Sequence, residues 1–431
     1  MKKTSQPYNQ IFWCTNANPE EQPCVNNLDI EVAVIGGGMA GLSAAQAFAK
    51  RGKKVALLEQ YFCGAGATGK SGGFITPNAE LSLSDFEKNT NTQSAQKIWK
   101  FITEGMENIK NNIVQNNFDC GYNSHAGLFV ANCKRTLKNL QQEHENVLKM
   151  GHESKFFDQQ SLQTIIGSEK YVGGITYENS FGINPYKYCS ALKRHLIDQG
   201  VLIFENTPVT NIDNHTITTQ HAKVTAKYII ICIDKFLPDL GKLKEHIYHA
   251  QNYILVSDQL TTQQIKQLFP QKQYMVWDSK LIYNYYRLTE DQRLLIGGGD
   301  LFSIYSKEKH NYTYGRNKLT RYIKKMFPEI DVTFTFQRPG LIGISKDIGP
   351  LAGPDQKHSH IYYIAGSAGL PIANALAHYS TQHLLDKRTD FDDYFKPNRP
   401  YFIGNTTQKI IGKKLSFALN NFMSQNTVGC F

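Results

Sequence analysis

The segment IEVAVIGGGMAGLSAAQAFAKRGKKVALLE, residues 30–59, decides the fold. Its first six residues are mostly apolar and β-branched, as in a buried parallel strand, and three glycines follow directly. Residues 39–52 are mostly good helix formers that end in a glycine, and residues 53–59 form a second apolar run that ends in an acid. The segment therefore predicts a strand, a glycine turn, a helix and a second parallel strand.

The glycines of this turn indicate a dinucleotide site. Gly36, Gly38 and Gly41 satisfy GxGxxG: the first permits a tight turn, the second lets the backbone approach a pyrophosphate, and the third lets the helix pack close to the strand. Glu59 ends the second strand, where a carboxylate can hold ribose hydroxyls and disfavours a 2′-phosphate, which indicates FAD or NAD. A glycine-rich turn without a ligand is the alternative. The neighbouring residues of the expected site are Met39, Ala40 and Gln60.

Length and composition exclude a small binding module and a mainly disordered chain. The 431 residues suffice for two or three domains or one interleaved unit, and 23 Tyr and 24 Phe can build a sizeable core. The net charge of +10 is dispersed along the chain, so it favours an anionic partner only weakly. The eight cysteines form no CxxC pair and have no metal-ligand spacing with His, which predicts reduced thiols and no metal site. We expect a cytoplasmic protein, because the chain has neither a signal peptide nor an apolar run of membrane-spanning length.

The loop GAGATGKSGGF, residues 64–74, favours FAD over NAD. A flavin extends beyond the diphosphate, so close-packed backbone must pass beside its ring. Here the sequence resembles the D-amino-acid-oxidase-like (DAO) family of FAD-dependent oxidoreductases, above all the branch that contains gamma-glutamylputrescine oxidase. ATGKSGG resembles that branch's ASGRNGG loop, with Lys70 and Ser71 in place of Arg and Asn. The resemblance implies that the flavin is contacted by Ala67, Thr68, Lys70, Ser71, Gly72 and Gly73.

The resemblance continues through most of the chain. HAGLFVA at 125–131 and the segment 167–188 are similar to the family's middle region, and ENTPVTNI at 205–212 is similar to the segment that holds the adenine. The run RPGLIGISKDIGPLAG at 338–353 resembles the family's glycine-rich approach to the flavin. In the strand–turn–helix at 361–385, the helix N-terminus would point at the pyrimidine ring, although the family's His is absent from the turn. The residues given cofactor contacts by this resemblance are Val209, Gly340, Gly366, Ser367, Gly369, Leu370 and Pro371.

The segment WDSKLIYNYYRLTEDQRLLIGGGD, residues 277–300, resembles the branch's YxRLxxDxRLLxGG hairpin. Strand alternation places Tyr283, Tyr285 and Arg287 on one face, which we expect to look at the flavin cavity. Arg287 is the predicted substrate anchor, because a guanidinium can grip a carboxylate through two parallel hydrogen bonds, and Tyr285 is its companion on the amine side. The alternatives are side chains that merely cover a sheet, and an ion pair of Arg287 with Asp291 or Glu290.

The implied fold class is α/β: a Rossmann-like FAD-binding domain interleaved with an antiparallel-sheet substrate domain, the two-domain fold of the glutathione-reductase and DAO type. A C-terminal helix with Ile411, Leu415 and Leu419 at helical spacing would dock on its own domain or, as the alternative, lie on a membrane surface. The expected divisions are an irregular leader at 1–28, the FAD-binding domain at 29–85, 176–245 and 336–395, the substrate domain at 86–175 and 246–335, and a C-terminal extension at 396–431.

The implied activity is oxidation of a C–N bond in an amine or amino acid, with hydride transfer to flavin N5, hydrolysis of the imine, and dioxygen or another acceptor taking the electrons. FAD is expected to be non-covalent, because the family's covalent His would fall at 68–71 and its covalent Cys at 340–350, and neither range holds such a residue. We expect neither a nucleic-acid partner nor integral membrane association. Flavin-dependent modification of a tRNA wobble base and a non-catalytic FAD-binding protein are the alternatives.

Overall fold

The computed structural model describes residues 11–14, 22–78, 82–280, 283–299, 312–366 and 369–424. The strand predicted at 30–35 is β1 (Leu28–Ile35), and it lies inside a sheet whose main order is β17-β18-β11-β1-β2-β8. β1 pairs in parallel with β11 and with β2. We call this the first sheet; its other strands are β2 (Val55–Leu58), β8 (Leu202–Phe204), β9 (Val209–Asp213), β10 (Thr216–Thr219), β11 (Lys223–Ile231), β17 (Leu351–Pro354) and β18 (Ile361–Ala365).

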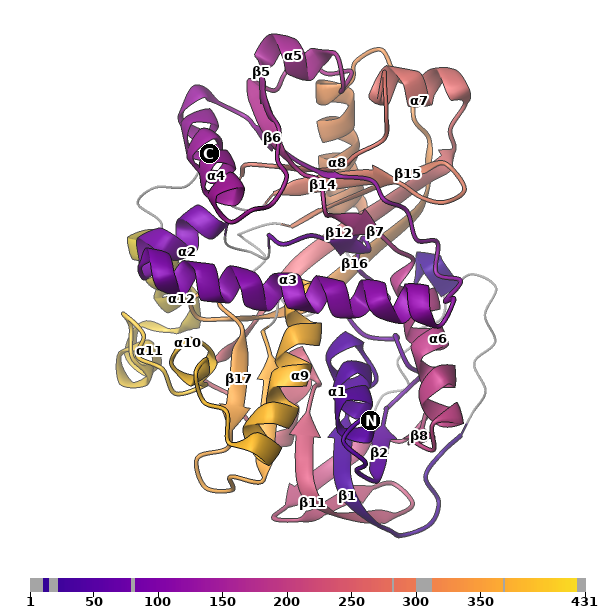
Figure 1. Cartoon of the computed structure of the whole chain (residues 1–431), viewed down its shortest axis with the longest axis vertical. Helices are drawn as coiled ribbons and strands as arrows, with labels where there is room; N and C mark the ends of the chain where they lie inside the picture. Colours follow the sequence, from indigo (N-terminus) through magenta and orange to yellow (C-terminus); the bar gives the residue numbers. More distant parts are fainter. Residues whose placement is uncertain are drawn as a thin grey trace.

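Helices pack against the strands of the first sheet and against one another. The predicted strand–turn–helix–strand unit is confirmed, with α1 (Met39–Ala49) between β1 and β2. α1 packs against α9 (Leu370–Asp386), and α9 packs against the long helix α3 (Thr92–Gln115), which lies across the molecule in Figure 1. α6 (Pro185–Asp198) also contacts α1.

The second sheet has the order β16-β12-β15-β14-β13-β4-β6-β5, and it forms the upper half of Figure 1. Its strands pair antiparallel, as expected, except that β13 and β4 pair in parallel. The bounds of its strands are β4 (Gly127–Ala131), β5 (Phe156–Asp158), β6 (Gly173–Tyr177), β12 (Ile247–Gln259), β13 (Met275–Asp278), β14 (Asn284–Leu288), β15 (Arg293–Gly299) and β16 (Phe334–Ser345), and the helices of this half are α4 (Lys134–Lys149), α5 (Gln159–Gln163), α7 (Thr262–Leu268) and α8 (Tyr312–Met326).

The expected domain divisions differ from the structure at three places. β16 belongs to the second sheet, because it pairs along its length with β12, although the third segment of the expected FAD-binding domain begins at 336. β6 belongs to the second sheet as well, although that domain was expected to resume at 176. Helix α3 was expected in the substrate domain, yet its apolar face packs on α9 of the first sheet. The domain to which each segment belongs is therefore set by the elements it packs against, and not by changes in the sequence pattern along the chain.

The expected C-terminal helix is interrupted. Gly412 adopts a positive φ of 81° between α11 (Asn405–Ile411) and α12 (Lys413–Ser424), so the apolar residues do not form one stripe. Phe417 is buried against Tyr248, whereas Leu415 is 51% exposed. The remaining elements are η2 (Phe12–Cys14), β3 (Phe74–Ile75), α2 (Leu83–Asn89), β7 (Phe181–Gly182), η3 (Asp234–Leu240) and α10 (Asp392–Phe395).

The cysteines of the described residues follow the expectation with one exception. Cys14, Cys24, Cys63, Cys120, Cys189 and Cys232 are free thiols. Cys133, at the start of α4, is disulfide-bonded, so the expectation that all the thiols are reduced is wrong there. Across the described part of the chain, no helix combines the length and the apolar character that a membrane crossing needs.

Candidate active site

A cavity of about 1500 Å³ lies between the two sheets. This volume exceeds the range of roughly 300–1,000 Å³ typical of pockets for small ligands, so an extended ligand and a second molecule fit together. Segments far apart in the sequence line it: the turn after β1, the end of β2, the loop 65–74, the segment 207–210, β16, and the start of α9. The predicted residues that line it are Gly36, Gly38, Met39, Ala40, Glu59, Gln60, Ala67, Thr68, Lys70, Ser71, Gly72, Gly73, Val209, Tyr285, Gly340, Gly369 and Leu370.

The glycine turn has no room for side chains. Gly36 has φ +103°, and a Cβ there would lie 2.6 Å from the carbonyl oxygen of Cys232. Gly41 does not line the cavity, but a Cβ there would overlap the carbonyl oxygen of Gly36, so the missing side chain lets α1 start close to the turn. Gly38 and Met39, at the N-terminus of α1, line the cavity. The free N–H groups of a helix N-terminus stabilise an anion bound there.

Glu59 connects the end of β2 to this turn. Its Oε2 accepts a hydrogen bond from the Gly37 N–H at 2.6 Å, and its Oε1 accepts one from the Tyr61 N–H at 2.9 Å. Burial raises the pKa of Glu59 to about 7, a rise that the backbone donors oppose and the nearby Glu205 carboxylate adds to. A carboxyl at the edge of a cavity with a perturbed pKa is a candidate for ligand contact.

The loop at 64–74 is held against the turn and against the second sheet. The Thr68 hydroxyl accepts a hydrogen bond from the Met39 N–H at 3.0 Å, which connects the loop to the start of α1. At the other end, a Cβ at Gly72 would lie 2.9 Å from the ring of Tyr285. The loop therefore forms a thin wall of backbone beside the cavity.

The turn before α9 is fixed by Asp234, one of three residues that stand where the family usually has a turn of small residues. Asp234 adopts φ +48° and accepts hydrogen bonds from the Gly366 N–H at 2.9 Å and the Gly343 N–H at 2.8 Å. Gly366 thus lies behind the cavity wall, bound to Asp234, while Gly369 and Leu370 face the cavity. Pro371 turns its carbonyl toward Gly105 of α3 rather than lining the cavity. Ser367 lies outside the described residues.

The predicted alternation of β14 is confirmed, because Tyr285 and Arg287 both contact the loop at 72 while Tyr286 and Leu288 enter the core of the second sheet. The prediction that Arg287 anchors the substrate is wrong in this geometry. Arg287 is 1% exposed and lies outside the cavity lining; its Nε donates to the Gly72 carbonyl and a terminal nitrogen donates to the Ile183 carbonyl, both at 2.6 Å. Desolvation lowers the pKa of this guanidinium to about 10.

A different guanidinium lines the cavity. Arg338 of β16 is buried, and one of its terminal nitrogens lies 3.1 Å from where a Cβ at Gly340 would be. Sequence reasoning missed it, although residues 338, 340 and 342 alternate toward one face of their strand. An aromatic wall begins at Phe74, the last residue of the loop, and continues through Trp277 to Phe129; Trp277 stacks on Phe129 with ring centroids 5.6 Å apart.

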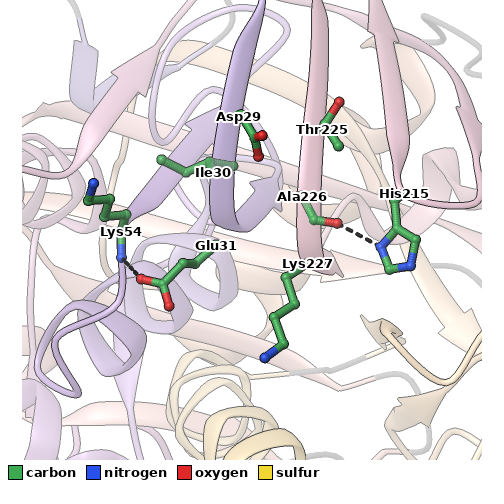
Figure 2. A pocket seen from close by; sticks show the side chains of 8 residues that line it. All are labelled: Asp29, Ile30, Glu31, Lys54, His215, Thr225, Ala226 and Lys227. Atoms are coloured by element: carbon green, nitrogen blue, oxygen red, sulfur yellow. Dashed lines mark hydrogen bonds between the residues drawn. The ribbon is translucent and has the colours of Figure 1, made fainter.

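A second, shallower hollow of about 430 Å³ lies at the other end of the first sheet. Figure 2 shows that β1 and β11 contribute to it near their amino ends, where Glu31 accepts a hydrogen bond from the Lys54 N–H and His215 is bound to the Ala226 carbonyl. Ligands of open parallel sheets bind at the carboxyl ends of the strands, so the large cavity is the candidate active site.

Comparison with known proteins identifies a family and curated relatives that the chain resembles. The sequence pattern of the family described as FAD dependent oxidoreductase (DAO) matches residues 31–382. The chain is 28% identical over 354 residues to a probable oxidoreductase OrdL of Haemophilus influenzae, covering 80% of this chain and 79% of that one. It is 27% identical over 350 residues to the gamma-glutamylputrescine oxidoreductase of Escherichia coli K12, covering 80% of both chains.

Solved structures share the fold at low sequence identity. Glycine oxidase from Geobacillus kaustophilus has a TM-score of 0.73 and 16% identity, covering 87% of this chain and all of that one. L-proline dehydrogenase from P. horikoshii has a TM-score of 0.72 and 17% identity, covering 86% of this chain and 97% of that one. The three proteins therefore share the overall fold.

Proposed function

The chain belongs to the DAO family of FAD-dependent oxidoreductases, and from that premise we propose that it dehydrogenates a C–N bond in a small molecule that carries an amine and a carboxylate. The family establishes FAD as the cofactor and amines or amino acids as the substrate class. The observation that carries the finer proposal is the pairing, in one cavity, of a glycine-lined dinucleotide turn with the guanidinium of Arg338 and an aromatic wall.

The residues present fit FAD. A Cβ at any position of the turn 36–38 would lie 2.6–3.1 Å from a neighbouring atom, Glu59 would hold a ribose at the end of β2, and the loop at 67–73 continues the wall beyond the N-terminus of α1. When bound, FAD supplies the hydride acceptor for the carbon next to nitrogen. The start of α9, with Gly369 and Leu370 in the cavity wall, directs a positive helix end at a ligand and stabilises negative charge there.

We further propose that the FAD is held non-covalently. Within the described residues that line the cavity, there is no His, and the cysteine is Cys232, whose pKa burial raises so that it stays a thiol. Cys63 lies behind Gly37 rather than in the cavity wall, and burial raises its pKa well above the ordinary value. Neither thiol is activated for bond formation.

The remaining residues position the substrate and exclude water. A substrate carboxylate would bind the Arg338 guanidinium, which is buried and therefore interacts more strongly than an exposed cation. The aromatic wall around Trp277 and the ring of Tyr285 would enclose the carbon chain, and such an apolar surface favours the neutral amine over the ammonium ion. Hydrolysis of the released imine gives a carbonyl compound and ammonia or a shorter amine, and dioxygen or another acceptor takes the electrons.

The decisive experiment is an anaerobic titration of the FAD-loaded protein. Glycine, L-proline, iminodiacetate, putrescine and gamma-glutamylputrescine would be added in turn, and loss of the flavin absorbance would be followed. We expect bleaching by at least one compound that carries both an amine and a carboxylate, and much slower bleaching by putrescine. Bleaching by none of them would contradict the proposed substrate class and would favour a non-catalytic FAD-binding protein.

A further inference from the structure

Four residues of the N-terminal region lie between the two sheets. Ile11 is 1% exposed and Cys14 is 4% exposed, and the Cys14 N–H closes a turn on the Ile11 carbonyl at 3.1 Å. On the side of the first sheet, these two residues pack with Phe62, Ala65 and Tyr186. A region expected to be an irregular leader therefore buries side chains inside the molecule at this segment.

The same segment reaches the second sheet through its aromatic residues. The ring of Phe12 contacts the ring of Phe336 on β16 edge to face, with centroids 5.5 Å apart. Phe12 and Trp13 pack on a cluster of Ile254, Val256 and Leu295. Ile11–Cys14 thus contacts both halves of the fold next to the cavity.

Trp13 is bound to the loop that forms the cavity wall. Its indole N–H donates to the Ser71 carbonyl at 2.9 Å. The Arg287 guanidinium carbon lies 5.3 Å from the centroid of the Trp13 ring, and the Arg287 Nε donates to the next carbonyl, Gly72, at 2.6 Å. Two successive carbonyls of the loop are therefore held by two side chains that stack on each other.

We propose that Trp13 is a positioning residue of the active site, which fixes the backbone of residues 71–73 through Ser71 and through the orientation of Arg287. The loop needs such support because its own residues are small: Gly69, Gly72 and Gly73 offer no side chains for packing, and glycine backbone is the most mobile. Only one part of this inference rests on the proposed function, namely that the supported loop contacts FAD.

The test uses two substitutions at Trp13 and one matched control. Trp13→Phe removes the indole N–H but keeps a ring over Arg287, whereas Trp13→Leu removes both interactions. Trp99→Phe is the control, because Trp99 is fully buried in α3, lies outside the cavity lining, and its indole N–H makes no hydrogen bond to the described residues. Each variant is measured as the full chain by FAD fluorescence titration and by the visible absorbance and circular dichroism of the bound flavin.

We expect Trp13→Phe to raise the Kd for FAD roughly two- to tenfold, the size of one neutral hydrogen bond, and Trp13→Leu to raise it further. Both should change the flavin circular dichroism, and kcat should fall more than KM rises. Trp99→Phe should leave the Kd and the spectrum unchanged. Wild-type Kd and spectrum in Trp13→Leu would overturn the proposal.

Amide hydrogen exchange in the FAD-free protein separates this inference from the proposed function. If Trp13 fixes the loop, Trp13→Leu exchanges the amides of residues 69–74 faster than the wild type, by roughly tenfold or more, while amides in α3 keep their rates. This result does not depend on FAD binding. Unchanged exchange at 69–74 would sink the positioning role even if the protein proved to be an amine-oxidising flavoprotein, and a wild type that binds no FAD would sink only the proposed function.

Discussion

Glu59 lines the cavity, and its burial disfavours the charged form of its carboxyl. Its carboxyl holds the Gly37 and Tyr61 amides, yet burial raises its pKa from 4.5 to about 7. In the FAD-free native state the proton is therefore kept up to near pH 7, while the unfolded chain releases it near pH 4.5. Between these values the unfolded state binds fewer protons, so stability falls as pH rises.

We predict that Glu59→Gln flattens the pH dependence of unfolding in FAD-free protein. From pH 5 to pH 8 the wild type should lose roughly 3 kcal/mol of unfolding free energy through this carboxyl, about 1.4 kcal/mol for each pKa unit. The variant should keep only the slope from other buried carboxyls with raised pKa values, such as Glu143 and Asp234. Urea unfolding at several pH values measures this.

Glu31→Gln is the matched control, because Glu31 also binds a backbone amide, that of Lys54, but lies at the surface with a lowered pKa. A carboxyl with a lowered pKa is ionised in both the folded and the unfolded state above about pH 5. Its substitution should therefore leave the slope of unfolding free energy against pH unchanged between pH 5 and pH 8. An unaltered wild-type slope in Glu59→Gln would refute the role of this carboxyl.

Substitution of the two buried arginines, Arg338 and Arg287, should affect different properties of the protein. Arg338→Ala should raise KM for substrates that carry a carboxylate by roughly 10–100-fold, the size of a charge-assisted hydrogen bond, with FAD affinity unchanged. Steady-state kinetics with a matched pair of amines, one lacking the carboxylate, measures this. Equal effects on both amines would remove Arg338 from the carboxylate site.

Arg287→Ala should instead weaken the protein and its FAD site. It leaves the buried carbonyls of Gly72 and Ile183 without their donors, which costs roughly 1–3 kcal/mol for each group. Thermal unfolding and FAD titration measure the two effects. A variant with wild-type stability and FAD affinity but a raised KM would restore Arg287 as the substrate anchor.

At the scale of elements, the contact between α3 and α9 fixes the helix end that faces the cavity. A Cβ at Gly105 of α3 would overlap the carbonyl oxygen of Pro371 in the first turn of α9. The helices can approach this closely only because residue 105 has no side chain, and Leu370 and Ala373 in the same turns of α9 line the cavity.

Gly105→Ala should therefore destabilise the protein and weaken FAD binding. The higher helix propensity of alanine stabilises the fold by about 1 kcal/mol relative to glycine, but overpacking against backbone costs roughly 1–3 kcal/mol. The substitution is therefore expected to lower the free energy of unfolding. Asn111→Ala, on the exposed face of α3, is the control that gains propensity without overlap. Chemical denaturation and FAD titration of both variants give the answer; a stabilised Gly105→Ala would show that α3 and α9 can separate freely.

At the scale of the whole molecule, the cavity wall comes from both sheets, so a ligand that fills it should join them. FAD at about 100 times its Kd should add roughly 2.7 kcal/mol to the unfolding free energy. ADP, which reaches only the turn and Glu59 on the first sheet, should raise the melting temperature less. Scanning fluorimetry with each ligand measures this, and equal shifts would contradict a site shared by both sheets.

The cofactor should also leave the denatured chain. Acid precipitation of FAD-loaded protein should give a yellow supernatant and a colourless pellet, because neither Cys63 nor Cys232 is activated for a covalent bond. Yellow colour that stays with the pellet would contradict non-covalent binding.

The amino-acid sequence by itself determined the parallel strands around the glycine turn, the positions of Glu59 and the loop at 64–74, and the face that Tyr285 and Arg287 share. These features follow from local rules, because glycine spacing and strand alternation act over a few residues. Tertiary structure decided which of the two arginines faces the cavity: Arg287 donates to Gly72, 215 positions earlier in the chain, and supports the loop, while Arg338 lines the cavity. It also decided that Asp234 holds Gly343 and Gly366 and that Trp13 reaches Ser71, since such contacts depend on how distant segments pack and leave no periodic signal in the sequence.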